Sequence, residues 1–253
     1  MIDKVVSDER TDEGTDGETN EGMEELRSYI EKLNIDGADE KMEQLRQYME
    51  GVLSWNEKVN LTAITDWQAF VQKHYIDSLL CAESLAFTAS SSICDVGTGG
   101  GFPGVPLAVC YPDKEFVLMD SLQKRVKIVR ELCDEIGLRN VTVIHGRAEE
   151  LARKKEYREN FDLCVSRAVA NMQVLSEYCL PFVKPGGYFI AYKGADCEAE
   201  ISDASRAIRI LGGDKPQIRE LPQLDHSLVV VRKKEPTPAA YPRKAGTPAK
   251  KPL

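Results

Sequence analysis

Between residues 92 and 232, short β-rich runs alternate with helical segments, and this alternation restricts the possible folds more than any other feature of the chain. Seven runs are recognisable: SSICDV, EFVLMD, VTVIHG, FDLCVS, GYFIAYK and a final pair that ends in SLVVVRK. Helical segments such as QKRVKIVRELCDEIG separate the earlier runs, which is typical of a parallel sheet with right-handed crossovers. No room for a helix remains between the last two runs, so we expect an α/β fold whose mostly parallel seven-stranded sheet has an antiparallel edge.

Composition divides the chain into four parts. Residues 1–22 are acidic and almost without apolar side chains, which predicts a disordered extension. Residues 23–85 carry apolar side chains at helical spacing and form an N-terminal helical cap, residues 86–232 form the α/β domain, and residues 233–253 form a basic, proline-rich tail. The first 25 residues hold ten acids and two bases, which accounts for the net charge of −8. Because the tail is basic, the overall acidity does not exclude a nucleic-acid substrate.

The apolar runs are short and the cysteines are scattered. No run approaches the roughly 20 residues of a membrane helix, and the first residues lack the apolar stretch of a signal peptide. We therefore expect a cytoplasmic protein without a membrane partner. The seven cysteines include no CxxC pair and most lie in apolar runs, which predicts reduced, buried thiols and no metal site. Nothing in the sequence resembles an exposed zipper, so we expect a monomer.

The stretch CDVGTGGGFPG, residues 94–104, is a glycine-rich turn between the first run and a helix. Gly99-x-Gly101-x-x-Gly104 is typical of dinucleotide-binding oxidoreductases, whereas Asp95-x-Gly97-x-Gly99-x-Gly101 is typical of S-adenosylmethionine (SAM) methyltransferases. An acid beside the turn disfavours a pyrophosphate and suits the ammonium group of SAM. Two prolines at the start of the helix also remove amide donors that a phosphate site would use. The turn therefore favours SAM.

Polar residues follow the next three strands at the same edge of the sheet, where open α/β sheets bind ligands. Asp120 closes the second run and is expected to accept hydrogen bonds from ribose hydroxyls, which both cofactors carry. Ala148 and Glu149 follow the third run, where the adenine would lie; the alternative for Glu149 is a first-turn helix acid. Arg167 ends the fourth run, where the transferred methyl group would lie; its alternative is an exposed loop charge.

Seven motifs occur in a fixed order: NEKVNLTAIT, HYIDSL, DVGTGGGFPG, DSLQKRV, GRAEEL, SRAVA and YPRKAGTPAKKPL. From about residue 45 to the end, the chain resembles the ribosomal RNA small subunit methyltransferase G family, also called the glucose-inhibited division protein B family. The resemblance implies a Rossmann-like SAM-dependent methyltransferase that methylates N7 of one guanine in the 530 loop of 16S rRNA in the 30S subunit. It implies the cofactor contacts Gly97, Phe102, Ala148, Glu149 and Arg167, to which the loop itself adds Asp95, Thr98, Gly99 and Gly101.

The chemistry of this reaction constrains the active site. Guanine N7 has an in-plane lone pair and no proton, so it can attack the methyl group directly and needs no general base. N7 lies on the major-groove edge, which is inaccessible in A-form RNA, so the target must be unpaired. The catalytic candidates are Arg167, Asn60 and His74, with Asp77 and Asn171 as further candidates for the guanine pocket. The alternatives are that the two asparagines only cap helices and that His74 and Asp77 form a pair on a helix surface.

Basic residues at one strand end and in the tail are candidates for contacts with RNA phosphates: Lys193, Arg243, Lys244, Lys250 and Lys251. The alternative is a tail packed on the body with solvated lysines. Three other functions compete with RNA methylation. An NAD(P)-dependent oxidoreductase would need a pair such as Tyr-x-x-x-Lys, which the tyrosines of the fifth run lack. A small-molecule methyltransferase would ignore RNA, and a non-enzymatic assembly factor would bind SAM without transferring its methyl group.

Overall fold

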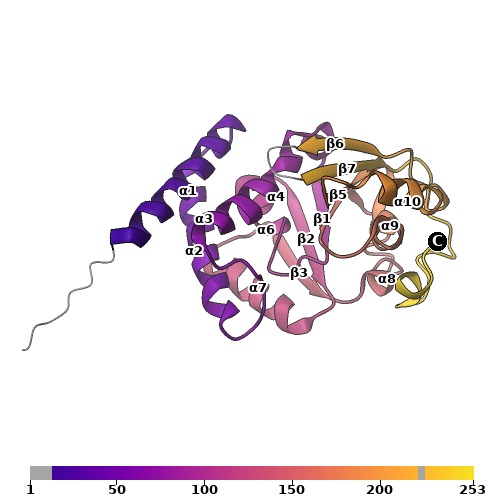
Figure 1. Ribbon diagram of the computed structural model, residues 1–253. Coiled ribbons are helices and arrows are strands. Elements are labelled where there is room, and N and C mark those ends of the chain that lie inside the picture. The colour runs from indigo at the N-terminus through magenta and orange to yellow at the C-terminus, as the bar shows by residue number, and fades with distance from the viewer. Residues whose placement is uncertain (1–12, 222–225) are drawn as a thin grey trace, which may run out of the picture.

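The computed structural model describes residues 13–221 and 226–253, whose strands form one mixed seven-stranded sheet (Figure 1). The strands are β1 (Ser92–Val96), β2 (Glu115–Asp120), β3 (Val141–His145), β4 (Phe161–Arg167), β5 (Val183–Gly194), β6 (Gln217–Leu221) and β7 (His226–Arg232). Their order across the sheet is β3-β2-β1-β4-β5-β7-β6. The order reverses between β1 and β4, and ligands bind open sheets of this kind at the carboxyl ends of the strands near such a reversal.

The first five strands run parallel, as the alternation of strands and helices predicts. β7 runs antiparallel to both β5 and β6, so the expected antiparallel edge is present. The structure adds the order within this edge, where β7 is the inner strand and β6 the outer one. The α-helical crossover after β5 leads to β6 at the edge of the sheet, and β7 lies between β5 and β6.

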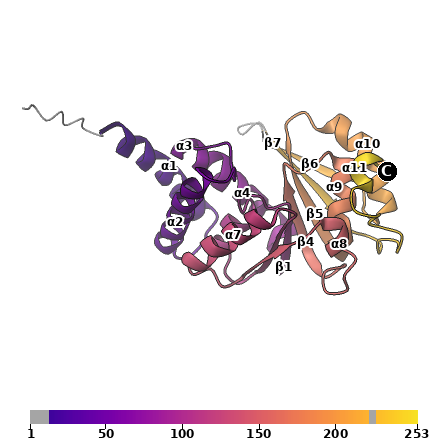
Figure 2. The ribbon, with the colours of Figure 1, turned by 90° about the horizontal axis from the view of Figure 1, so that it is seen from below.

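Helices cover both faces of the sheet (Figure 2). On one face lie α6 (Gly104–Cys110), α7 (Gln123–Glu135) and the N-terminal helices; on the other lie α8 (Ala148–Leu151), α9 (Met172–Cys179), the 3-10 turn η3 (Leu180–Phe182), α10 (Glu198–Ile210) and α11 (Thr247–Lys250). Each face of the sheet packs into its own hydrophobic core. Side chains alternate between the two faces along a strand, so Ile93 of β1 packs into one core and Cys94 packs into the other. The central parallel strands β1 and β4 are therefore buried on both faces, whereas the edge strand β3 is only partly buried.

The N-terminal cap is helical, as expected. It comprises α1 (Glu13–Lys32), α2 (Ala38–Asn56), α3 (Trp67–Phe70), the π-helical turn η1 (Val71–Ile76), α4 (Asp77–Leu79), the 3-10 turn η2 (Leu80–Glu83) and α5 (Leu85–Thr88). Helix α1 begins at Glu13, so the expected helix start at Met23 and the expected disorder of residues 13–22 are corrected. Leu26 and Ile30 anchor the later turns of α1 in the core, and each further residue then adds a backbone hydrogen bond without a new nucleation step. The expected disorder of residues 1–12 lies outside the described residues.

The cap is packed directly on the α/β domain. Gly51 of α2 faces α7 so closely that a Cβ atom at this position would lie 2.4 Å from Cδ2 of Leu132. The buried hydroxyl of Tyr48, one turn earlier, donates a hydrogen bond of 2.9 Å to the carbonyl of Gly100 in the glycine-rich turn. The cap therefore supports the turn that the sequence singles out for cofactor binding.

The remaining expectations from composition concern cysteines, membranes and metals. All seven cysteines fall within the described residues, and each is buried and unpaired, as predicted. No helix in residues 13–221 or 226–253 is long and apolar enough to cross a membrane. The same residues hold no group of three or more His, Cys, Asp or Glu side chains that could bind a metal ion.

Candidate active site

The glycine-rich turn between β1 and α6 forms the floor of the site. Gly99 and Gly101 have φ angles of 60° and 94°, in the left-handed region that favours glycine. A Cβ atom on Gly101 would lie 2.1 Å from Oη of Tyr48, whereas a Cβ atom on Gly99 would meet nothing within 4 Å. One glycine is thus required by packing against the cap, and the other leaves open space above the turn.

Asp95 braces the turn from inside. One of its carboxylate oxygens, Oδ2, accepts hydrogen bonds from the Thr98 hydroxyl at 2.7 Å and from the Gly104 backbone N–H at 3.0 Å. The other oxygen, Oδ1, is buried and has no hydrogen-bond partner within the described part of the chain. Burial raises the pKa of Asp95 to about 6, although the two hydrogen bonds oppose the shift. Because its side chain is fully buried, Asp95 supports the turn from within.

We expect Asp95 to make the stability of the ligand-free protein depend on pH. Its pKa is about 6 in the folded protein and near 3.8 in the unfolded chain. Because the folded protein holds the Asp95 proton more tightly than the unfolded chain does, protonation of Asp95 stabilises the folded state. This stabilisation of about 3 kcal/mol is fully present below pH 3.8, the pKa in the unfolded chain, and is lost as the pH rises through about 6. The Asp95→Asn variant should therefore become more stable relative to the parent as the pH rises to 6, with a constant difference above it. Urea unfolding from about pH 4 to about pH 7.5 measures this; parallel curves would refute it.

Asp120 joins the end of β2 to the glycine-rich turn. Its Oδ2 accepts a hydrogen bond of 3.0 Å from the Gly99 backbone N–H, and its Oδ1 accepts one of 2.8 Å from the Leu122 N–H. Each carboxylate oxygen can accept a second bond. The carboxylate is thereby held in one orientation beside the turn, with acceptor capacity left for two hydroxyl donors such as those of a ribose.

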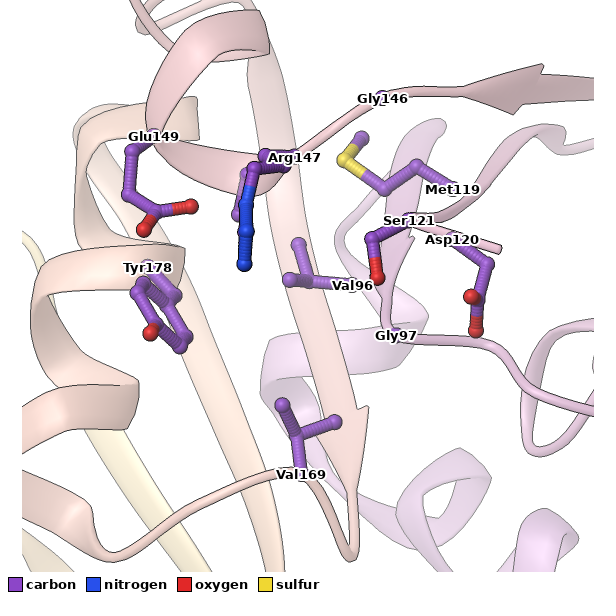
Figure 3. Close-up of a pocket in the computed structure, with 11 residues that line it drawn as sticks. Val96, Gly97, Met119, Asp120, Ser121, Gly146, Arg147, Glu149, Val169 and Tyr178 are labelled. Carbon is purple, nitrogen blue, oxygen red and sulfur yellow. The ribbon is translucent and has the colours of Figure 1, made fainter. Parts of the chain in front are cut away.

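A cavity of about 110 Å³ lies over the ends of β1, β2 and β3 (Figure 3). Eleven residues line it: Val96, Gly97, Met119, Asp120, Ser121, Gly146, Arg147, Ala148, Glu149, Val169 and Tyr178. Asp120 and Ser121 lie on one side of the cavity, and Glu149 and Tyr178 lie on the other (Figure 3). Pockets that enclose a whole ligand usually measure roughly 300–1,000 Å³, so this cavity would hold one end of SAM and the rest would extend over the open turn at Gly99.

Four of the predicted cofactor residues, Gly97, Asp120, Ala148 and Glu149, line this cavity. The sequence analysis did not predict the other residues that line the cavity. Ser121 and Arg147 directly follow or precede predicted residues at strand ends, so the same strand-end rule could have included them. Val169 and Tyr178 come from the loop after β4 and from α9, and no local sequence signal marks them as cavity residues.

Arg167 is the centre of a second cluster. It ends β4, and its side chain is only 13% exposed, so the alternative of an exposed loop charge is wrong. Its Nη1 donates to the Asp77 carboxylate at 2.5 Å and to the Lys73 carbonyl at 3.1 Å, and its Nη2 lies 3.3 Å from Nδ1 of His74. The guanidinium also lies 5.6 Å from the ring centre of Phe102 in the glycine-rich turn. Arg167 thus links the sheet, the cap and the turn.

His74 is a neutral side chain in this cluster. Its ring stacks on Phe102 with centres 4.3 Å apart and planes 5° from parallel. A guanidinium can only donate, so Nδ1 of His74 is the acceptor, and the proton on Nε2 is donated to the Thr62 hydroxyl at 2.7 Å. Burial and the charge of Arg167 lower the pKa of His74 to about 3. Both ring nitrogens are therefore engaged within the protein, which leaves no free lone pair on His74 to accept a proton from a substrate.

Asp77 is buried beneath Arg167. Its exposed fraction is 2%, and its Oδ1 lies 2.7 Å from Nδ1 of His226. Burial would raise the pKa of Asp77, but the hydrogen bond from His226 and the charge of Arg167 outweigh it and hold the pKa below its ordinary value. The alternative of a His74–Asp77 pair on a helix surface is wrong, because both side chains turn inward to Arg167.

The two asparagine candidates have different positions. The side chain of Asn171 accepts a hydrogen bond of 3.1 Å from the Val174 N–H at the start of α9, so it caps this helix. Asn60 lies exposed in the loop after α2 and does not cap a helix. Its neighbour Asn56 instead accepts hydrogen bonds from the backbone of this loop, beginning with the Leu61 N–H at 2.8 Å.

Two of the basic candidates are engaged within the protein. Lys193 is mostly buried and forms an ion pair of 2.6 Å with Glu200. Arg243 forms an ion pair of 2.6 Å with Glu177, whose side chain is 1% exposed. Both side chains therefore meet buried or half-buried carboxylates that no local sequence pattern identifies. Their contacts with RNA phosphates stay a prediction.

The rest of the tail is packed on the body of the protein, as the alternative interpretation of its basic residues predicts. Arg158 donates hydrogen bonds to the carbonyls of Thr237 at 2.7 Å and Tyr241 at 2.8 Å, which fixes the tail on the body. Three lysines stay exposed on its surface: Lys244, Lys250 and Lys251. An ordered tail with solvated lysines is therefore the observed arrangement.

A mostly parallel seven-stranded sheet with a braced glycine-rich turn and an adjoining cavity defines the class of SAM-dependent methyltransferases. Solved structures support this fold: the SAM-dependent methyltransferase SibL in its apo form has a TM-score of 0.57 at 14% identity, covering 87% of this chain and 77% of that one. An O-methyltransferase family protein from Burkholderia thailandensis has a TM-score of 0.52 at 13% identity, covering 78% and 72%.

Sequence comparison assigns the family. The family model described as GidB, rRNA small subunit methyltransferase G, matches residues 41–229. The ribosomal RNA small subunit methyltransferase G of Clostridium novyi (strain NT) is 47% identical over 232 residues, covering 90% of this chain and 96% of that protein. The protein of the same name from Alkaliphilus metalliredigens (strain QYMF) is 45% identical with 90% and 97% coverage. The chain belongs to the rRNA small subunit methyltransferase G family, which confirms the resemblance noted from its motifs.

Proposed function

We propose that the protein transfers the methyl group of SAM to N7 of a guanine in the 530 loop of 16S rRNA, within the bacterial 30S subunit. The observation that carries the choice of N7 is the state of His74. Its Nδ1 lies 3.3 Å from Nη2 of Arg167, both of its ring nitrogens are engaged, and its pKa is about 3. A nucleophile that carries no proton needs no such base, and the N7 lone pair is of this kind.

The residues that would hold SAM are those of the turn and the strand ends: Asp95, Gly97, Thr98, Gly99, Gly101, Phe102, Asp120, Ala148 and Glu149. When bound, SAM supplies an electrophilic sulfonium methyl group. Asp120 would hold the ribose through its free lone pairs, and Asp95 would hold the turn in shape from below. The protein then contributes mainly alignment, which can lower a barrier by roughly 7–11 kcal/mol in the best cases.

Arg167 would orient the substrate. Its guanidinium is fixed by Asp77, by the Lys73 carbonyl and by the face of Phe102. Methylated guanine carries positive charge, which disfavours a cation against the ring itself, so the guanine O6 or an RNA phosphate is the better partner. Asn60 lies exposed in the loop from the cap and would contact the RNA, and His74 would keep Arg167 in place. The exposed lysines Lys244, Lys250 and Lys251 would lie along RNA phosphates.

The experiment is transfer of tritiated methyl from SAM to 30S subunits from cells that lack the endogenous enzyme. Chemical cleavage at N7-methylguanine then maps the site, and subunits that already carry the modification serve as the matched control. We expect label at one guanine of the 530 loop in the unmodified subunits only. Label at another nucleotide would refute the proposed substrate. Tight SAM binding without transfer to RNA would favour an assembly factor or a small-molecule methyltransferase.

A further inference from the structure

The segment 241–248, called the strap below, crosses the helices that form one wall of the cavity. In Figure 1 this C-terminal segment, in yellow, lies against α8. Its strongest contact joins Arg243 to Glu177 of α9. The backbone N–H of Arg243 donates to Oε1 at 2.7 Å, Nε donates to Oε1 at 3.0 Å, and Nη2 donates to Oε2 at 2.6 Å. Both oxygens of a buried carboxylate are thus satisfied by one residue of the strap.

A second contact ties the strap to α8. The backbone N–H of Gly246 donates a hydrogen bond of 2.8 Å to Oε1 of Glu149. Glu149 is 4% exposed and lines the cavity. Each carboxylate oxygen can accept two hydrogen bonds, so this contact leaves acceptor capacity for a ligand. The Gly246 backbone has a φ angle of 79°, which directs this N–H to Glu149 and is a conformation that favours glycine.

Both contacts are made to residues at the cavity wall or next to it. Glu177 directly precedes Tyr178, and Tyr178 and Glu149 lie together on the same side of the cavity (Figure 3). We infer that the strap is part of the cofactor site, in which Arg243 and Gly246 are positioning residues that hold Tyr178 and Glu149 against the nucleoside end of SAM. The inference rests on the assignment of this cavity to SAM. It gives Arg243 a role in cofactor affinity in place of the RNA contact expected from its charge.

The physical reason is the cost of leaving Glu177 without its partner. A buried carboxylate that loses a paired cation carries an uncompensated desolvation cost, which favours its movement toward water. Movement of Glu177 displaces the adjacent Tyr178, and the cavity wall loses its shape. Arg243 itself is 24% exposed at its side chain, so its removal opens a path for water without removing any group that faces the cavity.

The test is a double-mutant cycle on SAM binding, measured by calorimetry on the full chain. Arg243→Met and Glu177→Gln should each raise the Kd for SAM by about fivefold or more, the lower end of typical coupling between sites. The Kd for SAM of the double variant should be no higher than that of the single variant with the higher Kd, because both substitutions remove the same interaction. Arg243→Met should raise the KM for SAM with little change in kcat, and its affinity for 30S subunits should stay that of the parent. Arg206→Met, at an exposed arginine of α10, is the matched control.

A second variant covers the case in which Arg243→Met does not fold. Gly246→Ala adds a Cβ atom that meets nothing within 4 Å, so it strains only the backbone that presents the N–H to Glu149, and it should also raise the Kd for SAM. Unchanged SAM binding in folded variants would overturn the inference, as would weaker 30S binding in Arg243→Met that Glu177→Gln does not reproduce. If the parent itself does not bind SAM, the cofactor assignment fails and the inference fails with it; if it binds SAM but does not methylate rRNA, only the proposed function fails.

Discussion

Replacing Gly101 by alanine should lower kcat/KM by about 100-fold, because the turn can no longer keep its shape beneath the cap. Its φ of 94° strains any residue with a Cβ atom, at about 1–2 kcal/mol. The new atom would also lie 2.1 Å from Oη of Tyr48 and 2.8 Å from Cγ2 of Val105. Overpacking of this kind costs about 1–3 kcal/mol, so we also expect unfolding to be easier by about 3 kcal/mol. Methyl-transfer kinetics and urea unfolding measure the two effects.

Gly99→Ala is the matched comparison for this prediction. Gly99 has a similar positive φ of 60°, but a Cβ atom there meets nothing within 4 Å. This variant should lose only the strain energy and keep most of its stability. Any loss of SAM affinity would then report on the space above the turn. Equal loss of stability in the two variants would show that backbone strain, and not the contact with Tyr48, determines the effect.

The second large effect is expected for Arg167→Ala. Its removal leaves the buried carboxylate of Asp77 with His226 alone and leaves Nδ1 of His74 without its donor. Breaking a buried ion pair from one side costs about 3–5 kcal/mol. Because Arg167 also holds the cap against the turn, kcat/KM should fall by about 100-fold or more. Thermal or urea unfolding and methyl-transfer kinetics measure both losses.

Two further variants separate the structural role of Arg167 from its role in the reaction. In Arg167→Met/Asp77→Asn no buried charge is left unpaired, so stability should largely return while activity stays low. Arg167→Lys keeps the charge but cannot reproduce the three contacts of the planar guanidinium, and it should recover less than a tenth of the activity. Full activity in either variant would exclude a direct role for the guanidinium in orienting the substrate.

The order of strands and helices and the cofactor turn could be read from the sequence. Strand runs, crossover helices and glycines are local patterns, and a parallel sheet brings the ends of its strands to one edge. For this reason the sequence predicts that Gly97, Asp120, Ala148 and Glu149 contact the cofactor, and in the structure all four line one cavity. The sequence also left Glu149 between two roles, as an adenine-facing residue and as a first-turn acid. In the structure it is a first-turn acid of α8 that also lines the cavity.

Local sequence patterns could not predict which side chains the charged residues contact. Arg243 and Lys193 have the pattern of solvated bases, yet they meet Glu177 and Glu200, 66 positions away and 7 positions away. Likewise, His74 and Asp77 are three residues apart on a helical segment, and only Arg167, 90 positions from Asp77, shows why both turn inward. Local periodicity describes how a chain folds on itself over a few turns. An ion pair between distant residues depends on which surfaces the packed helices bring together, and that choice is made by the whole core.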